Sequence, residues 1–170
     1  MLPVHKRIIK EVLREKKKES NVVSILLYGS LARGTATKKS DVDIEIIHSG
    51  SKYKDTHKYR YGIKVDFEYW PEKKLAKRIG NYPFLSYPYL EEKILYDPNG
   101  FAKNIKKQLE GYFKKNPEAM IEWKKWTKEY LEFKKKGIKR TNKEKVRSCK
   151  EFYDKLEIKF SKNHKVTRNF

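Results

Sequence analysis

Two aspartates separated by one residue follow a glycine–serine pair in this sequence. The pair is Gly29-Ser30, and after ten intervening residues the chain presents Asp41 and Asp43. Residues two apart on a strand point to the same face, so these two carboxylates are expected to lie side by side. Asp66, on a later predicted strand, would add a third. Hard carboxylate oxygens suit Mg²⁺, or Mn²⁺ as a substitute, which shares its coordination shell with water and phosphates. The pattern therefore predicts a metal site formed by the three aspartates.

The glycine–serine pair is positioned to hold a phosphate group. Gly29 follows an apolar run and precedes a possible helix start, where backbone N–H groups and the Ser30 hydroxyl can bind an anion. A glycine–serine pair alone is also a common turn, so its meaning depends on the aspartates after it. The acids themselves could instead form the wet face of an antiparallel sheet, paired with lysines elsewhere. For Glu45 and Glu68 that simpler interpretation is favoured.

The elements that must position these residues alternate between helix and strand. Apolar spacing predicts a helix over 3–18, and the run at 22–28 predicts a strand buried on both faces. Strict alternation predicts an amphipathic strand over 41–46, and a strand pair is expected on either side of Gly62 within 57–70. A helix from Pro71 to about Arg78 and a short strand at 93–97 follow. The sequence thus indicates an αβ domain over 1–98.

Residues 99–170 are predicted to form a basic helical region docked on that domain. Apolar residues recur at helical spacing in three segments, which begin near Phe101, after Pro117 and near Asn142. The second segment is rich in aromatic residues, namely Trp123, Trp126, Tyr130 and Phe133. Such rings could stack on nucleic-acid bases, but their spacing favours a core or a homodimer interface.

Net charge and composition limit the classes of partner that the protein can have. The formal net charge is +20, and residues 99–170 carry 22 Lys and Arg against 9 Asp and Glu, compared with 20 against 13 in residues 1–98. This excess favours anionic partners such as nucleotides or nucleic acid, although lysine-rich helices can also be simply solvated. No apolar run approaches the roughly 18 residues of a membrane span, and no signal peptide is apparent, so a cytoplasmic protein without membrane contact is expected.

The spacing of Gly29-Ser30, Asp41, Asp43 and the later Asp66 resembles the nucleotidyltransferase superfamily that includes DNA polymerase β. The fuller stretch GSLARGTATKKSDVDIEI is similar to the signature of its minimal nucleotidyltransferases. The resemblance covers about residues 22–70. It implies an α+β fold with a mixed β-sheet and flanking helices, followed here by the C-terminal helical region.

The resemblance also implies roles for individual residues. Gly29, Ser30, Arg33 and Ser40 would bind the nucleotide. The three aspartates, Asp41, Asp43 and Asp66, would be both the catalytic and the metal-binding residues. The implied reaction is attack of a hydroxyl group on the α-phosphorus of a nucleoside triphosphate, most simply ATP, with release of pyrophosphate.

The sequence does not identify the acceptor, which is the molecule whose hydroxyl group would receive the nucleoside monophosphate. Within the resembled superfamily it could be a protein, such as a helical HEPN-type toxin, or a small molecule, and the basic helices leave RNA as a third choice. A second class of function is an antitoxin-type or nucleic-acid-binding module that keeps the fold and acts mainly by binding. The preserved aspartates argue against that class, because a cluster of like charges costs stability.

Overall fold

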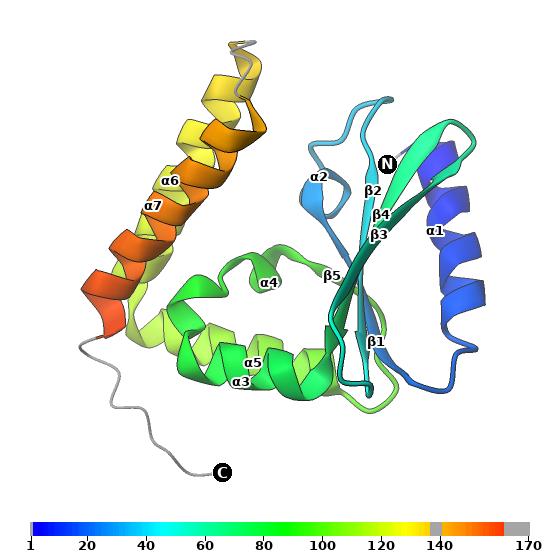
Figure 1. The fold of residues 1–170 in the computed structure, drawn as a ribbon, viewed down its shortest axis with the longest axis horizontal. Helices are drawn as coiled ribbons and strands as arrows, with labels where there is room; N and C mark the ends of the chain where they lie inside the picture. The colour runs from blue at the N-terminus through cyan, green and yellow to red at the C-terminus, as the bar shows by residue number, and fades with distance from the viewer. Residues whose placement is uncertain (1, 137–140, 162–170) are drawn as a thin grey trace. The chain divides into compact units, whose positions relative to one another are not determined.

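The computed structural model describes residues 2–136 and 141–161, and these divide into two compact units (Figure 1). The first unit combines the chain up to Arg78 with Pro88–Gln108, and the second combines Ile79–Tyr87 with the chain from Leu109 onward. The units are therefore interleaved in the sequence. The proposed domain boundary near residue 98 remains a prediction.

The first unit contains a mixed sheet that has five strands among the described residues, in the order β3-β4-β2-β1-β5. The neighbours β2 and β4 are parallel, and the other neighbouring pairs are antiparallel. The expected α+β class with a mixed sheet and flanking helices is thereby confirmed. The strands are β1 (Val22–Tyr28), β2 (Val42–His48), β3 (Lys54–Arg60), β4 (Ile63–Pro71) and β5 (Lys93–Tyr96).

The helices begin and end close to the predicted points. They are α1 (Pro3–Lys16), α2 (Gly29–Arg33), α3 (Glu72–Asn81), α4 (Pro88–Glu91), α5 (Phe101–Lys115), α6 (Pro117–Lys135) and α7 (Asn142–Phe160), with the 3-10 turn η1 (Pro83–Leu85) between α3 and α4. The turn η1 and helix α4 lie in the proline- and tyrosine-rich segment between α3 and β5, for which no element was predicted.

Helix α1 covers one face of the sheet (Figure 1). Its apolar stripe, which includes Ile8 and Val12, is buried against Ile25, Ile44 and Phe67 of the sheet. Burial of this stripe stabilises the helix, because a helix of 14 residues is marginal by itself in water. The same packing fixes β1, β2 and β4, which are the strands that carry the candidate site.

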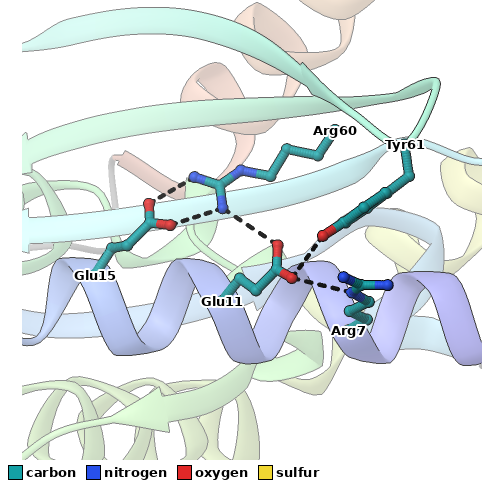
Figure 2. Close-up of polar contacts among 5 residues, drawn as sticks. All are labelled: Arg7, Glu11, Glu15, Arg60 and Tyr61. Carbon is teal, nitrogen blue, oxygen red and sulfur yellow. Dashed lines mark hydrogen bonds and ion pairs between the residues drawn. The ribbon is translucent and has the colours of Figure 1, made fainter.

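The turn between β3 and β4 is also fastened to α1, as Figure 2 shows. Arg60 donates two hydrogen bonds to Glu15, at 2.9 and 2.6 Å, and lies 3.6 Å from a carboxylate oxygen of Glu11. The Tyr61 hydroxyl donates to Glu11 at 2.7 Å, and Arg7 donates to the same carboxylate at 3.1 Å. This network ties the far end of the hairpin to the helix.

In the second unit, α6 and α7 run side by side (Figure 1). Trp123 of α6 is 2% exposed, and its Nε1–H donates to the Phe84 carbonyl of η1 at 2.6 Å. Phe152 packs edge-on against Trp123 and stacks on Trp126. The expectation that Trp123 is a core residue is thus confirmed, whereas Tyr130 remains 41% exposed.

Candidate active site

Gly29 lies where β1 ends and α2 begins, and its backbone is suited to glycine alone. Its φ is +70°, which side chains rarely adopt. A Cβ placed there would overlap Oδ2 of Asp43 and lie 2.8 Å from its Cγ. The carboxyl group of Asp43 therefore lies directly against the Gly29 α-carbon. The glycine–serine pair and strand β2, which carries Asp43, thus form one site.

The sheet register brings the aspartates together. Asp43 pairs with Tyr28 on β1, and on its other side with Asp66 on the parallel strand β4. Asp41 is exposed and directly precedes β2, which begins at Val42, one residue later than the predicted start of the strand. Burial raises the pKa of Asp43 to about 6, and the negative charges of Asp66 and Asp41 contribute to the shift. The three carboxylates are thus close enough to repel one another.

The positive side chain of Lys64 forms an ion pair with this cluster. Lys64 Nζ lies 2.6 Å from Oδ1 and 2.8 Å from Oδ2 of Asp66. The hydrogen bond to Asp66, more than any other contact, raises the pKa of Lys64, so the lysine remains charged. Sequence reasoning did not single out this residue, although its position two residues before Asp66 on the same strand places it on the same face.

The nucleotide-binding candidates lie around α2. Ser30 is in the first turn of the helix, and its carbonyl accepts the backbone N–H of Thr35 at 3.0 Å, which closes the helix end. Arg33 is exposed and lies 3.8 Å from the Glu91 carboxylate of α4. The N-terminal turn of α2 lies beside Asp43, because Gly29 at its start contacts the Asp43 carboxyl group.

Ser40 has a different setting from the other candidates. Its hydroxyl accepts the backbone N–H of Thr37 at 2.9 Å, so it holds a turn, and its carbonyl lies 2.9 Å from Nε2 of the buried His5 on α1. A nucleotide-binding role for Ser40 stays a prediction. His5 was one of four histidines without a recognisable spacing, and its contact with the loop before Asp41 could not be foreseen.

A cavity of about 260 Å³ opens beside Gly29. It is lined by residues of β1, α2, α4 and the residue after α4, namely Tyr28, Gly29, Ala32, Arg33, Pro88, Glu91 and Glu92. Glu92 is 9% exposed, and its buried Oε2 has no hydrogen-bond partner among the described residues. Burial, with the charge of Glu45 as a second cause, raises the pKa of Glu92 well above its usual range. The cavity therefore carries a carboxylic acid that can donate as well as accept a hydrogen bond.

The two acids expected on a wet face, Glu45 and Glu68, are buried and half-buried, respectively. Glu45 is 3% exposed and accepts the Tyr89 hydroxyl at 3.0 Å, and burial raises its pKa to about 8. Glu68 accepts hydrogen bonds from the Tyr28 hydroxyl and from Trp70 Nε1, each at 3.2 Å. The favoured interpretation as a solvated side chain was wrong for Glu45, which is buried with the Tyr89 hydroxyl as its partner. Glu68 is half-buried, and its hydrogen bonds go to aromatic side chains instead of a lysine.

The donor set fits a hard divalent cation only in part. Within the described residues, no group of three or more His, Cys, Asp or Glu side chains is arranged to hold a metal ion. Oxygen ligands from Asp43 and Asp66, with Asp41 beside them, would leave most of an octahedral shell to water and phosphate, as is usual for Mg²⁺. The mutual repulsion of the carboxylates is consistent with such a cation.

Comparison with known proteins agrees with this geometry. A family model described as a nucleotidyltransferase domain matches residues 6–157. “Putative protein adenylyltransferase MJ1305” of Methanocaldococcus jannaschii is 31% identical over 134 residues, which are 70% of this chain and 90% of that protein. “Putative protein adenylyltransferase MJ1379” of the same organism is 32% identical over 101 residues, which are 52% of this chain and 93% of that protein.

A solved structure shares the fold. The crystal structure of a nucleotidyltransferase-like protein from Exiguobacterium sibiricum superposes with a TM-score of 0.50 at 16% identity. The match covers 61% of this chain and 38% of the other. In the part of the chain that the structure describes, no helix is both long and apolar enough to cross a membrane. The resemblance drawn from the glycine–serine and aspartate spacing is confirmed.

Proposed function

The chain is a transferase of the nucleotidyltransferase family, and we propose that it moves AMP from ATP to a hydroxyl group of a protein in a Mg²⁺-dependent reaction. The observation that carries the proposal is the contact of the Asp43 carboxyl group with Gly29, beside Asp66 on the adjacent strand. This contact joins a phosphate-binding turn to a pair of carboxylates. The choice of AMP and of a protein acceptor is supported by the names of the two archaeal relatives.

In the proposed site, the protein binds and orients the triphosphate. The backbone N–H groups at the start of α2 and the Ser30 hydroxyl donate to phosphate oxygens, and the Arg33 guanidinium offers a charged donor near the same turn. Asp41, Asp43 and Asp66 would hold the metal ion. A bound Mg²⁺ would offset the negative charge of the carboxylates and of the phosphates.

The acceptor oxygen then forms a bond to the α-phosphorus, and the bond from that phosphorus to the oxygen bridging to the β-phosphorus breaks. Pyrophosphate leaves with the electron pair of the broken bond. Asp66 receives the proton of the hydroxyl group. Lys64 positions Asp66 for this step, because its ammonium group contacts both carboxylate oxygens. The reaction balances without an oxidant or a second cofactor.

A thermal-melting series tests the donor and the metal. Wild-type protein is heated with ATP, CTP, GTP or UTP, each with and without Mg²⁺. We expect the largest rise in Tm with ATP plus Mg²⁺ and none with Asp43→Asn. Asp55→Asn is the matched control, because it makes the same change on exposed strand β3 of the same sheet. A metal-independent shift, or one that Asp43→Asn retains, would contradict the proposal.

Transfer itself is followed with ATP labelled at the α-phosphate, incubated with the protein and a cell lysate. Label in protein bands that requires wild-type Asp43 supports a protein acceptor. Label confined to RNA or to small molecules would reject that acceptor while leaving nucleotidyl transfer in place. A homodimer remains a prediction, which sedimentation of the same sample would test.

A further inference from the structure

A second cavity, of about 180 Å³, lies at the opposite end of β1 and β2 from Gly29 and Asp43. His48, which lines it, pairs with the first residue of β1, whereas Asp43 pairs with the last. The five-residue separation of Asp43 and His48 along β2 corresponds to about 17 Å. The cavity is lined by Glu19, Asn21, Val22, Ile46, His48, Lys52, Lys54 and Tyr69. It is therefore separate from the candidate active site.

The buried side chain in this cavity is a hydrogen-bond donor without an acceptor. His48 is 8% exposed, and its Nδ1 accepts the backbone N–H of Gly50 at 3.0 Å. In the neutral ring the proton must then lie on Nε2. That atom is buried and has no hydrogen-bond partner among the described residues. A buried donor left unpaired costs free energy, which an acceptor in the cavity would offset.

The charges around the cavity are mainly positive. Lys52 and Lys54 are exposed side chains with no ion pair in the described part of the chain. Lys54 also lies 6.0 Å from the centre of the Tyr69 ring. The one carboxylate in the lining, Glu19, accepts a hydrogen bond from Lys16 at 2.6 Å, so its charge is already balanced. Among the described residues, therefore, neither lysine of the lining forms an ion pair with a carboxylate.

We propose that this cavity binds a small anion through a phosphate group. His48 Nε2–H donates to one phosphate oxygen at the base of the cavity, Lys52 and Lys54 bind the others at its rim, and the Tyr69 ring forms a wall. The volume of the cavity limits the size of its ligand, because pockets that enclose drug-sized molecules usually have volumes of about 300 Å³ or more. Inorganic phosphate or a small phosphate monoester fits this chemistry, whereas a whole nucleoside triphosphate does not.

Residue-resolved NMR with inorganic phosphate tests the proposal. Phosphate is titrated into ¹⁵N-labelled full-length protein while chloride keeps the ionic strength constant. We expect saturable shifts of the Gly50, Lys52 and Lys54 amide signals. The double variant Lys52→Ala/Lys54→Ala should bind at least about tenfold more weakly, because two charge-assisted contacts are lost. Amide resolution separates this site from phosphate bound near Gly29, so failure here leaves the proposed transferase site unaffected.

The matched control is Lys10→Ala/Lys58→Ala, which removes the same charge from exposed positions on α1 and β3. An equal loss of affinity in this control would show a general charge effect and overturn the proposal. Shifts that do not saturate, or that are confined to residues 28–34, would overturn it as well. His48→Phe keeps a ring and removes the donor, and should weaken binding by at least about tenfold. If circular dichroism shows that this variant is unfolded, the lysine pair decides the question.

Discussion

At Gly29 two requirements meet, namely a positive φ of 70° and an α-carbon that lies against the carboxyl group of Asp43. Gly34, five residues later, shares only the first, with a φ of 77° and no heavy atom within 4 Å of an added Cβ. The two glycines therefore allow backbone strain to be separated from displacement of the aspartate. The comparison stays within one short helix and its C-terminal cap.

We expect Gly29→Ala and Gly34→Ala to share a destabilisation of about 1–2 kcal/mol, which is the usual cost of this backbone region for a side chain. Gly29→Ala must in addition move Asp43, and should lower the rate of ATP-dependent transfer by about 100-fold or more. Urea unfolding and pyrophosphate release measure the two effects. Equal loss of activity in both variants would show that the contact with Asp43 has no catalytic importance.

Glu92 gives a prediction on pH. Its pKa is raised by burial above that of an unfolded chain, so the folded protein binds this proton more tightly. The stabilising contribution is complete below about pH 4.5 and is lost as the pH rises through the folded pKa. Glu92→Gln should therefore make the unfolding free energy fall less steeply between pH 5 and pH 8, as measured by urea titration. Glu110→Gln, on an exposed face of α5, is the control, and an unchanged slope in Glu92→Gln would refute the assignment.

At the residue scale, the sequence predicted the site residues that belong to a recognisable motif. Asp43 and Asp66 were found because their motif spacing and the alternation within each strand are local properties, whereas their cross-strand pairing is not. Glu45 was misjudged for the opposite reason. Its burial depends on Tyr89, which is 44 residues away in the chain, and no local periodicity carries that information. His5 and Glu92 escaped notice in the same way.

At the element scale, the predicted helix over 3–18 and the strand at 22–28 match α1 and β1 closely. Long apolar stripes and β-branched runs fix such elements before any tertiary contact forms. Strand β2 was expected to present one wet face, and instead both faces are mostly buried from Ile44 to His48. The family resemblance implied a mixed sheet, but the order of its strands and the parallel pairing of β2 with β4 were not predicted, because local patterns do not encode them.

The network of Figure 2 predicts how the hairpin is held to α1. The Arg60 side chain is 19% exposed and contacts both Glu15 and Glu11, so it should contribute more than an isolated surface ion pair. We expect Arg60→Ala to lower the free energy of unfolding by about 1–2 kcal/mol, and Lys58→Ala on the same strand by less than about 0.5 kcal/mol. Chemical unfolding in low and high salt measures both. Equal effects would show that the network adds nothing beyond net charge.

At the scale of the whole molecule, a chain with a formal charge of +20 concentrates three carboxylates in one site. The surrounding positive potential favours the approach of an anionic nucleotide, and the local carboxylates favour a cation. The two tendencies cooperate when the nucleotide arrives as its metal complex. The basic surface is therefore compatible with the proposed reaction and does not by itself require nucleic acid as a partner.

The interleaving of the two compact units gives the last prediction. The second unit includes Ile79–Tyr87, where the Phe84 carbonyl accepts the Trp123 indole N–H and the Tyr87 ring stacks on Trp123 at 6.1 Å. A fragment of residues 99–170 lacks this segment. Removing it exposes the large buried side chain of Trp123 and leaves its N–H without that partner. We expect the fragment to lose cooperative thermal unfolding and to show red-shifted tryptophan emission.

The matched chain contains residues 79–170 with 88–108 replaced by a glycine–serine linker of equal length. It restores the missing segment of the second unit without residues of the first unit, so it should unfold cooperatively and emit at shorter wavelength. Circular dichroism and fluorescence on the two chains make the comparison. Cooperative unfolding of the 99–170 fragment alone would favour the boundary near residue 98 as a true domain limit, and would mean that the Phe84 and Tyr87 contacts are not needed for the helical part to fold.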